Sequence, residues 1–251
     1  MRDFLKKYLF WPWQLYVWFI YLPLVAIWTM IMATIVIFTA IFISKEKASK
    51  YPSAVWAKVC TWLTPALVRV KGREHLAEGQ AYVVVSNHQS QYDILLLYGW
   101  IGLSVKWIMK KEIRKIPAIG IANEKIGNIF IDRSNPAAAQ KTINNAIAEL
   151  KDGVGILFFP EGTRSKDGNL LPFKKGAFRI AIEQQLPILP VTVRGTRGIL
   201  PSGSFTPFPG RMRLRLHPPI PVAGLKLENK EDLPALMEES RRVIESGFGL
   251  D

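Results

Sequence analysis

An uncharged stretch, Tyr8–Ile43, contains no Asp, Glu, Lys or Arg and constrains the fold most strongly. It divides at Leu22-Pro23, because proline lacks the backbone N–H that continues a helix. The first part, Tyr8–Tyr21, is rich in Trp and Tyr, which favour the interface between bilayer and water. The second part, Leu24–Ile43, has 20 apolar or hydroxyl-bearing residues, enough for a helix to span about 30 Å of hydrocarbon. A cleaved signal peptide does not fit, because the stretch is too long and lacks a small-residue cleavage site.

Basic residues flank this stretch on both sides: Arg2, Lys6 and Lys7 before it, and Lys45, Lys47 and Lys50 after it. Positive charge is enriched on the cytoplasmic side of membranes, so we expect both ends of the stretch to face the cytoplasm. Two helices that turn at Pro23 and dip into one leaflet satisfy this condition. Residues 1–50 are therefore predicted to form a two-helix membrane anchor, with a single span as the alternative. A buried core helix would have to hide Trp and Phe on every face.

The chain as a whole is basic. Its 251 residues include 33 Lys and Arg against 20 Asp and Glu, a net charge of +13. Anionic lipid, a phosphorylated or acidic substrate, or nucleic acid would each explain this excess. Nucleic acid is not a predicted partner, because the aromatic residues concentrate in the apolar N-terminus instead of alternating with basic ones. The predicted location is a membrane with the active site on its cytoplasmic face, the inner membrane if the source is bacterial.

Several kinds of site are excluded by the residues present. The single cysteine, Cys60, rules out an internal disulfide and a cysteine-built zinc site. The three histidines, His75, His88 and His217, are far apart and form no H-E-x-x-H pattern, so no metal ligands are predicted. The chain also lacks the G-x-S-x-G elbow of serine hydrolases and the phosphate-binding P-loop.

After Lys50 the pattern becomes that of a single α/β domain, residues 51–251. Short apolar runs predict buried strands at Ala81–Ser86, Val105–Met109, Asn128–Asp132, Gly155–Phe159 and Ile188–Val193, and alternation predicts a half-exposed edge strand at Met212–Leu216. Helices are predicted at Ser53–Val70, Tyr92–Trp100, Pro136–Lys151, Lys175–Gln184 and Lys230–Ser246. The alternation of strands and helices predicts a mixed, largely parallel sheet flanked by helices.

The segment Asn87–Asp93 (NHQSQYD) directly follows a predicted buried strand. Strand ends in parallel sheets are where sites usually form. His88 and Asp93 can meet only if His88 lies in the turn and Asp93 in the first helical turn, because five residues of helix advance about 500°. Asp93 would then orient the imidazole of a catalytic base. Ser90-x-x-Asp93 is also a capping box, which would leave His88 an ordinary loop residue. The spacing alone leaves both readings open, and they can coexist.

Cations follow three further predicted strands. Arg164 lies in Phe159–Ser165 (FPEGTRS), Arg133 ends Gly127–Arg133 (GNIFIDR), and Lys110 follows the strand Val105–Met109. Arginine grips phosphate with two parallel hydrogen bonds. Because parallel strands end at one edge of a sheet, these side chains are candidates for an anion site, although each alone could be a solvated surface charge.

Together, NHQSQYD, GNIFIDR, FPEGTRS and ILPVTV (188–193) resemble four ordered blocks of the glycerolipid acyltransferases, specifically the 1-acylglycerol-3-phosphate acyltransferases. The resemblance covers Ala81–Val193 and implies the α/β fold of glycerol-3-phosphate acyltransferases. It implies transfer of a fatty acyl group to the sn-2 hydroxyl of a lysophosphatidic acid, giving phosphatidic acid. The donor would be acyl-coenzyme A or acyl carrier protein, and no cofactor is implied.

The resemblance also assigns roles to individual residues. His88 and Asp93 would be the catalytic pair. Phosphate-binding roles fall on Lys110, Arg133, Glu161, Gly162 and Arg164, with Glu161 orienting the site instead of touching phosphate. Lys110 is favoured over Lys111. Glycerol-3-phosphate or another lysophospholipid remains an alternative acceptor, and a structural membrane scaffold would leave the four blocks unexplained.

Overall fold

A seven-stranded sheet forms the centre of the computed structural model, which describes residues 9–132, 134, 136–148 and 153–249. The strand order is β1-β7-β6-β2-β5-β3-β4. The strands are β1 (Ala66–Lys71), β2 (Val83–Ser86), β3 (Ser104–Lys110), β4 (Ile129–Ile131), β5 (Val154–Phe158), β6 (Ile188–Arg194) and β7 (Gly210–Leu216). Neighbours pair in parallel except β6 and β7, so the predicted mixed, largely parallel sheet is confirmed.

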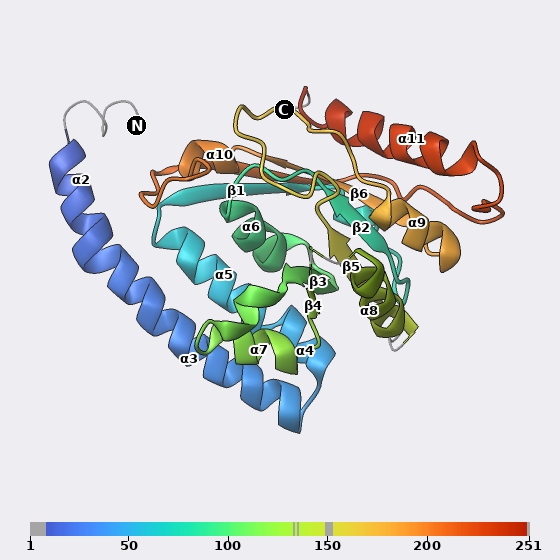
Figure 1. Ribbon diagram of the computed structural model, residues 1–251. Helices are drawn as coiled ribbons and strands as arrows, with labels where there is room; N and C mark the ends of the chain where they lie inside the picture. The colour runs from blue at the N-terminus through green and yellow to red at the C-terminus, as the bar shows by residue number, and fades with distance from the viewer. Residues whose placement is uncertain (1–8, 133, 135, 149–152, 250–251) are drawn as a thin grey trace.

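Helices cover both faces of the sheet (Figure 1). On one face lie α5 (Pro52–Trp62) and α6 (Tyr92–Trp100), and on the other α8 (Pro136–Ala148), α9 (Gly176–Glu183) and α11 (Asp232–Ser246). Short elements complete the chain: α4 (Lys45–Lys50), α7 (Ile119–Lys125) and α10 (Thr196–Ile199), with 3-10 turns η2 (Arg73–His75) and η3 (Lys111–Lys115). Strand β2 is buried along its whole length because helices lie on both of its faces.

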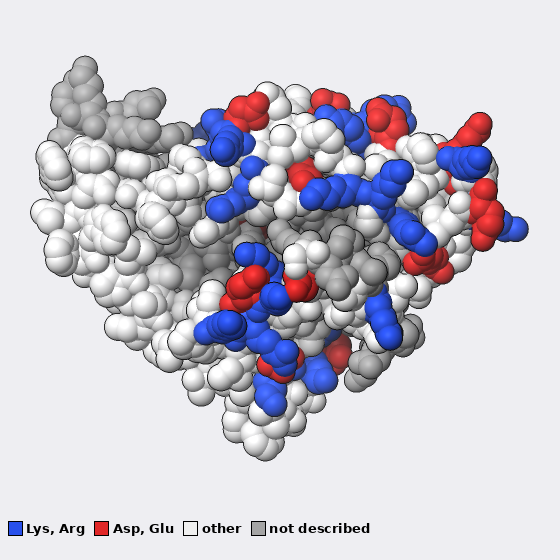
Figure 2. Space-filling model, viewed as in Figure 1, with Lys and Arg blue, Asp and Glu red and all other residues white. Residues whose placement is uncertain are grey.

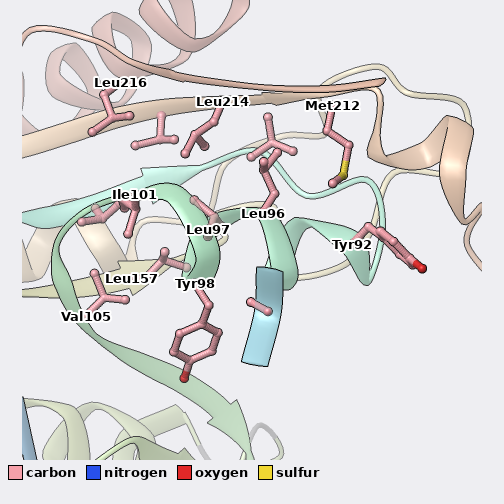
Figure 3. Packing of buried hydrophobic residues seen from close by; sticks show 14 of the residues in the cluster. Tyr92, Leu96, Leu97, Tyr98, Ile101, Val105, Leu157, Met212, Leu214 and Leu216 are labelled. Carbon is pink, nitrogen blue, oxygen red and sulfur yellow. The ribbon is translucent and has the colours of Figure 1, made fainter. Parts of the chain in front are cut away.

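Helix α6 is fixed on the sheet by its leucines. Leu96 and Leu97 are fully buried against Met212 and Leu214 of β7 (Figure 3). Burying a leucine side chain contributes about 1.5–3 kcal/mol. This packing holds the first turn of α6, which carries Asp93, in a fixed position relative to the sheet.

The predicted helix Ser53–Val70 is wrong in its second half. Helix α5 ends at Trp62, and Ala66–Lys71 is the edge strand β1. Pro65 interrupts the helix because it has no N–H to donate. The segment Met212–Leu216, predicted as the edge, is covered on its outer side by β1 and lies second in the sheet.

The expected turn at Leu22–Pro23 does not form. Helix α2 (Phe10–Tyr16), a π-helical turn η1 (Val17–Tyr21) and α3 (Leu22–Phe42) form one continuous helix, with helical backbone angles at Tyr21 and Leu22. Leu22 donates its N–H to the carbonyl of Val17, five residues back. Such a wide turn accommodates Pro23, whose ring would crowd the carbonyl four residues earlier in a regular helix. The prediction of two separate helices is therefore not confirmed.

One side of this long helix packs on the domain. Ala33, Val36 and Ala40 contact Ala122 and Ile126 at α7. The outward side exposes large apolar residues, among them Trp11, Leu15, Trp18, Phe19, Ile27, Met30, Phe38, Ile41 and Phe42. In Figure 2 the surface over the helix is free of charged side chains, which gather on the other half of the molecule. The helix is long and apolar enough to cross a membrane, which is consistent with membrane association.

Candidate active site

Strands β2, β3 and β5 run parallel, so their carboxyl ends meet at one edge of the sheet. The loop after β2 carries His88, the loop after β5 carries Glu161 to Arg164, and β3 ends at Lys110. The structure therefore brings three of the sequence-predicted segments to the same edge. Arg133 lies outside the described residues.

His88 and Asp93 are in direct contact. The Nδ1 atom of His88 lies 2.8 Å from Oδ2 of Asp93, whose side chain is fully buried. A carboxylate there selects the tautomer with a proton on Nδ1, which leaves Nε2 able to accept a proton. The histidine side chain keeps 16% of its surface exposed, so a substrate can reach it.

One half of the predicted capping box is present, the bond from the Ser90 N–H to the Asp93 carboxylate. Asp93 Oδ2 also accepts the backbone N–H groups of Gln89, at 2.6 Å, and Ser90, at 2.8 Å. The Ser90 hydroxyl oxygen accepts the N–H of Tyr92 at 3.1 Å and donates to the carbonyl of Leu200. One carboxylate oxygen of Asp93 therefore binds the loop before α6 and contacts the imidazole, so the two readings are compatible in geometry, and the role of His88 as a base stays a prediction.

The imidazole of His88 is also held by an aromatic ring. It stacks on Phe159 with centroids 3.9 Å apart and an angle of 11° between the planes. Phe159 begins the FPEGTRS loop, so this loop packs directly on the face of the histidine. With one edge on Asp93 and one face on Phe159, the ring has a single orientation.

Glu161 joins the two loops through their backbones. Its Oε1 accepts the N–H of His88 at 2.8 Å, and its Oε2 accepts the N–H of Leu171 at 3.0 Å. Ser165 in turn donates its N–H to the carbonyl of His88 at 2.8 Å. Burial raises the pKa of the Glu161 carboxyl, and the two backbone N–H groups oppose that rise. Both oxygens accept backbone N–H groups, so Glu161 ties the loop after β5 to the loop that carries His88.

The turn after Glu161 needs glycine. Gly162 has φ +73°, and a Cβ atom there would lie 2.6 Å from Nζ of Lys174. Lys174 thus covers this turn, although no motif in the sequence marks this lysine. Arg164 is half-buried in the same loop and, among the described residues, forms no ion pair. A half-buried arginine and a neighbouring lysine make this loop suited to an anion.

Lys110, the last residue of β3, and Lys111, the next residue, are both exposed. Lys110 lies 3.5 Å from the Glu112 carboxylate, and Lys111 pairs with Asp132, which follows β4. Lys111 therefore has a partner that the sequence analysis did not foresee. The structure places Lys110 at the correct edge but brings it into no described contact with His88.

Asn87 links the site to β6. Its amide nitrogen donates to the carbonyl of Val193 at 2.9 Å, and its oxygen accepts the N–H of Val193 at 2.7 Å. The ILPVTV block therefore serves the site by holding the loop that carries His88. Only the adjacency of Asn87 and His88 in the sequence hinted at this role.

An apolar cavity of about 490 Å³ lies beside the site, between the long N-terminal helix and the domain. Its walls come from α3, α5, α6 and α7, and residues Gln91 and Tyr92, next to Asp93, contribute to them. The lining also includes Val25, Met32, Val36, Trp56, Leu95, Met109, Ile119 and Phe205. These segments are far apart in the sequence, so no local pattern could reveal the cavity.

Within the described residues, no group of three or more His, Cys, Asp and Glu side chains is placed to hold a metal ion. The chemistry available at this edge is that of an oriented imidazole beside cations and an apolar cavity. Fold and site together define an α/β domain with a histidine–aspartate pair at the carboxyl edge of a largely parallel sheet.

Comparisons with known proteins agree with this class. The model of the family described as Acyltransferase matches residues 67–194, half of the chain. The crystal structure of the 1-acyl-sn-glycerophosphate (LPA) acyltransferase from Thermotoga maritima superposes with a TM-score of 0.73 at 30% identity, covering 90% of this chain and 93% of that one. The chain belongs to the acyltransferase family.

Curated relatives carry related names. A chloroplastic 1-acyl-sn-glycerol-3-phosphate acyltransferase of Brassica napus is 39% identical over 72% of this chain, and an alpha form of Ovis aries is 37% identical over 72%. The chain spans 51% and 62% of the length of these two relatives.

Proposed function

We propose that the chain transfers a fatty acyl group from a thioester to the sn-2 hydroxyl of 1-acyl-glycerol-3-phosphate, which gives phosphatidic acid. The observation that carries the proposal is the contact of His88 with buried Asp93 at the sheet edge. The names of the relatives, all lysophosphatidate acyltransferases, support the choice of acceptor.

The reaction needs one base and no covalent intermediate with the protein. Nε2 of His88 removes the proton of the acceptor hydroxyl while its oxygen attacks the thioester carbonyl. Asp93 stabilises the imidazolium that forms. The tetrahedral intermediate then collapses, the C–S bond breaks, and the imidazolium returns its proton to the departing thiolate. The products are an ester and a free thiol.

Cations around the FPEGTRS loop would bind the acceptor phosphate. Arg164 is half-buried, lacks an ion partner in the described chain, and sits two residues after the Gly162 turn. Lys110 and Arg133 stay in this role as predicted ligands, and Lys174 joins them because it lies over Gly162. Glu161 positions the loop. Fixing the phosphate places the hydroxyl next to His88, which makes its attack effectively intramolecular.

The cavity beside the site fits a hydrocarbon chain. It is apolar, has about 490 Å³ of room, and is walled on one side by the N-terminal helix. Such a cavity replaces water around an acyl chain, at about 0.8 kcal/mol per buried CH₂. The N-terminal helix is therefore part of the substrate site as well as a membrane contact.

The helix Phe10–Phe42 lies along one leaflet in this proposal. Near its start, Trp13 donates its ring N–H to the carbonyl of Pro207, and near its end Ala40 packs with α7. A helix that contacts the same domain along its whole length cannot cross the bilayer without drawing the domain in. The domain and its active site would then stay on the cytoplasmic face.

The assay that tests the function uses purified protein, lysophosphatidic acid and each donor, acyl-coenzyme A and acyl carrier protein, with His88→Ala as control. Phosphatidic acid should form with the wild type only. Lysophosphatidic acid should also compete with glycerol-3-phosphate and with another lysophospholipid in one assay. If one of these is acylated preferentially, the proposed acceptor is wrong and the proposed acyl transfer still holds.

Topology is tested with cysteines at Leu9 and Lys47 in a Cys60→Ser background, labelled in sealed vesicles. Both should react from the cytoplasmic side. Labelling of one of them from the opposite side would establish a single span.

A further inference from the structure

One face of β1 and β7, together with Arg194 at the end of β6, carries mostly basic side chains. The outward residues there are Leu67, Arg69 and Lys71 of β1, Arg211, Arg213 and Arg215 of β7, and Arg194 of β6. Six of these seven are basic and none is acidic. We call these seven residues the basic sheet face. The opposite side of β1 and β7 packs on the core beneath α5 and α6.

The strand register places the cations directly opposite one another. Arg69 is the Cα partner of Arg213, and Arg213 is the Cα partner of Arg194, so three arginines form one row across three strands. Lys71 pairs with Arg215 in the next row. Like charges opposite each other destabilise a sheet.

A sheet face that only contacts water would be more stable with mixed charges or threonines than with this row of like charges. In the described part of the chain, no ion pair is formed by Arg69, Arg194, Arg211 or Arg215. Their charge is therefore available to an anionic partner.

The basic sheet face begins next to the active site. Arg194 directly follows Val193, whose backbone pairs with the side chain of Asn87, the residue before His88. Neighbouring strands lie about 4.8 Å apart, so Arg69 is roughly 10 Å from Arg194 across the sheet. Arg211 lies at the same edge, where its carbonyl closely approaches Gly195. A partner bound here would sit within a short reach of the histidine.

The face is turned away from the apolar helix. In Figure 1, α5 lies between α3 and β1, so the sheet separates the basic sheet face from the helix that contacts the membrane. A bilayer that covers the outer side of α3 leaves this face open to the aqueous phase. The exposed Leu67, with 66% of its surface accessible, adds an apolar contact among the cations. This combination fits a folded acidic protein better than a lipid surface.

We propose that the basic sheet face docks an acidic carrier protein that brings the acyl group as a thioester on its prosthetic arm. This inference rests on the acyltransferase function proposed above, and it names the donor that the function left open. Complementary charge accelerates such an encounter and fixes its orientation. From the docked carrier, the arm would pass over the edge beside β6 to reach His88.

The test reverses two exposed charges of this face, Arg69→Glu with Arg211→Glu, in the full-length protein in detergent. Neither residue belongs to the catalytic or phosphate-binding groups. The matched control, Lys226→Glu with Lys230→Glu, makes the same change of net charge in the exposed loop before α11. Three quantities are measured: KM for acyl carrier protein, KM for acyl-coenzyme A, and affinity for holo-acyl carrier protein at low and high salt.

The reversed variant should raise KM for acyl carrier protein by about tenfold or more, because each new carboxylate would repel the acidic partner. Its KM for acyl-coenzyme A should change by less than about threefold, and kcat should be retained. The affinity for holo-acyl carrier protein should fall in parallel and should be salt-sensitive in the wild type. The control variant should match the wild type.

Three results would overturn the docking proposal: an unchanged KM for acyl carrier protein, an equal rise for both donors, or no binding of holo-acyl carrier protein by the wild type. Weaker flotation of the variant with anionic vesicles, with carrier binding intact, would assign the face to the membrane instead. If the wild type acylates no lysophosphatidic acid with either donor, the proposed function fails. If the function fails but the wild type binds holo-acyl carrier protein and the reversed variant does not, the basic sheet face is still supported as the docking surface.

Discussion

The carboxylate of Glu161 accepts the backbone N–H of His88 at 2.8 Å, and this bond joins the loop after β5 to the loop after β2. The FPEGTRS segment therefore builds the histidine loop in addition to any contact with substrate. A buried carboxylate that receives two backbone N–H groups leaves both donors unsatisfied when it is removed. Leaving each of them unpaired costs about 1–3 kcal/mol.

Glu161→Ala should therefore lower both stability and turnover. We expect a drop of at least about 4 °C in Tm, since two unpaired donors together cost about 2–6 kcal/mol and about 1 kcal/mol shifts a domain of this size by 2–4 °C, and a kcat at least about tenfold lower. Glu161→Gln keeps one acceptor oxygen and should recover part of both losses. Thermal unfolding and steady-state kinetics measure the two effects. Full activity of Glu161→Ala would show that the histidine loop does not depend on this bond.

Asp93 has two roles that one substitution can separate. Asp93→Asn keeps an acceptor oxygen for the N–H groups of Gln89 and Ser90 but cannot stabilise an imidazolium at His88. We expect a kcat roughly 10²- to 10⁴-fold lower with little loss of Tm, close to the effect of His88→Ala. Near-normal turnover together with a lower Tm would assign Asp93 to helix capping alone.

Arg164 should affect the acceptor more than the donor. A charge-assisted hydrogen bond contributes about 1.5–3 kcal/mol, so Arg164→Ala should raise the KM for lysophosphatidic acid roughly 10- to 150-fold. Arg164→Lys should recover only part of this, because lysine lacks the two-pronged geometry. Arg179→Ala, on the exposed side of α9, is a matched control. An equal rise in the KM of both substrates would point to a folding defect.

His217 should make stability depend on pH. Burial, followed by the charges of Arg215 and His75, lowers the pKa of His217 from 6.5 to about 4. The hydroxyl of Thr192 donates to the Ile244 carbonyl, so it accepts the Nε2–H of a neutral His217 at 2.8 Å. The unfolded chain takes up a proton near pH 6.5 and the folded chain does not.

The free energy of unfolding therefore does not depend on His217 above about pH 6.5. It falls as the pH drops from about 6.5 towards about 4, by at most about 3 kcal/mol, because only the unfolded chain takes up the proton. Chemical unfolding of the wild type between pH 7.5 and pH 4.5 should show this decline, and His217→Gln should show less of it. His75→Gln removes the smallest of the three causes of the lowered pKa and should change the slope less than His217→Gln does. Identical slopes for wild type and His217→Gln would contradict the assignment.

Local sequence was sufficient for the elements whose pattern matches their environment. Helix α6 was predicted with the bounds it has, because capping residues precede it and apolar residues fill it. The buried strands were found within one or two residues, since continuous β-branched runs occur where both faces are covered. Strand β1 is missed because Leu63, Leu67 and Val70 follow helical spacing, and only the pairing with β7 decides between helix and strand.

Local sequence alone predicts the candidate reacting groups: a histidine and an aspartate around a helix start, with cations after neighbouring strands. Tertiary structure decided how they are held. The stacking of His88 on Phe159, the bridge from Glu161, and the link from Asn87 to Val193 each join segments from different parts of the chain. The cavity and the basic sheet face arise in the same way, from packing of the N-terminal helix and from strand register. These contacts join residues that are far apart in the sequence, so the spacing of residues within one segment does not predict them.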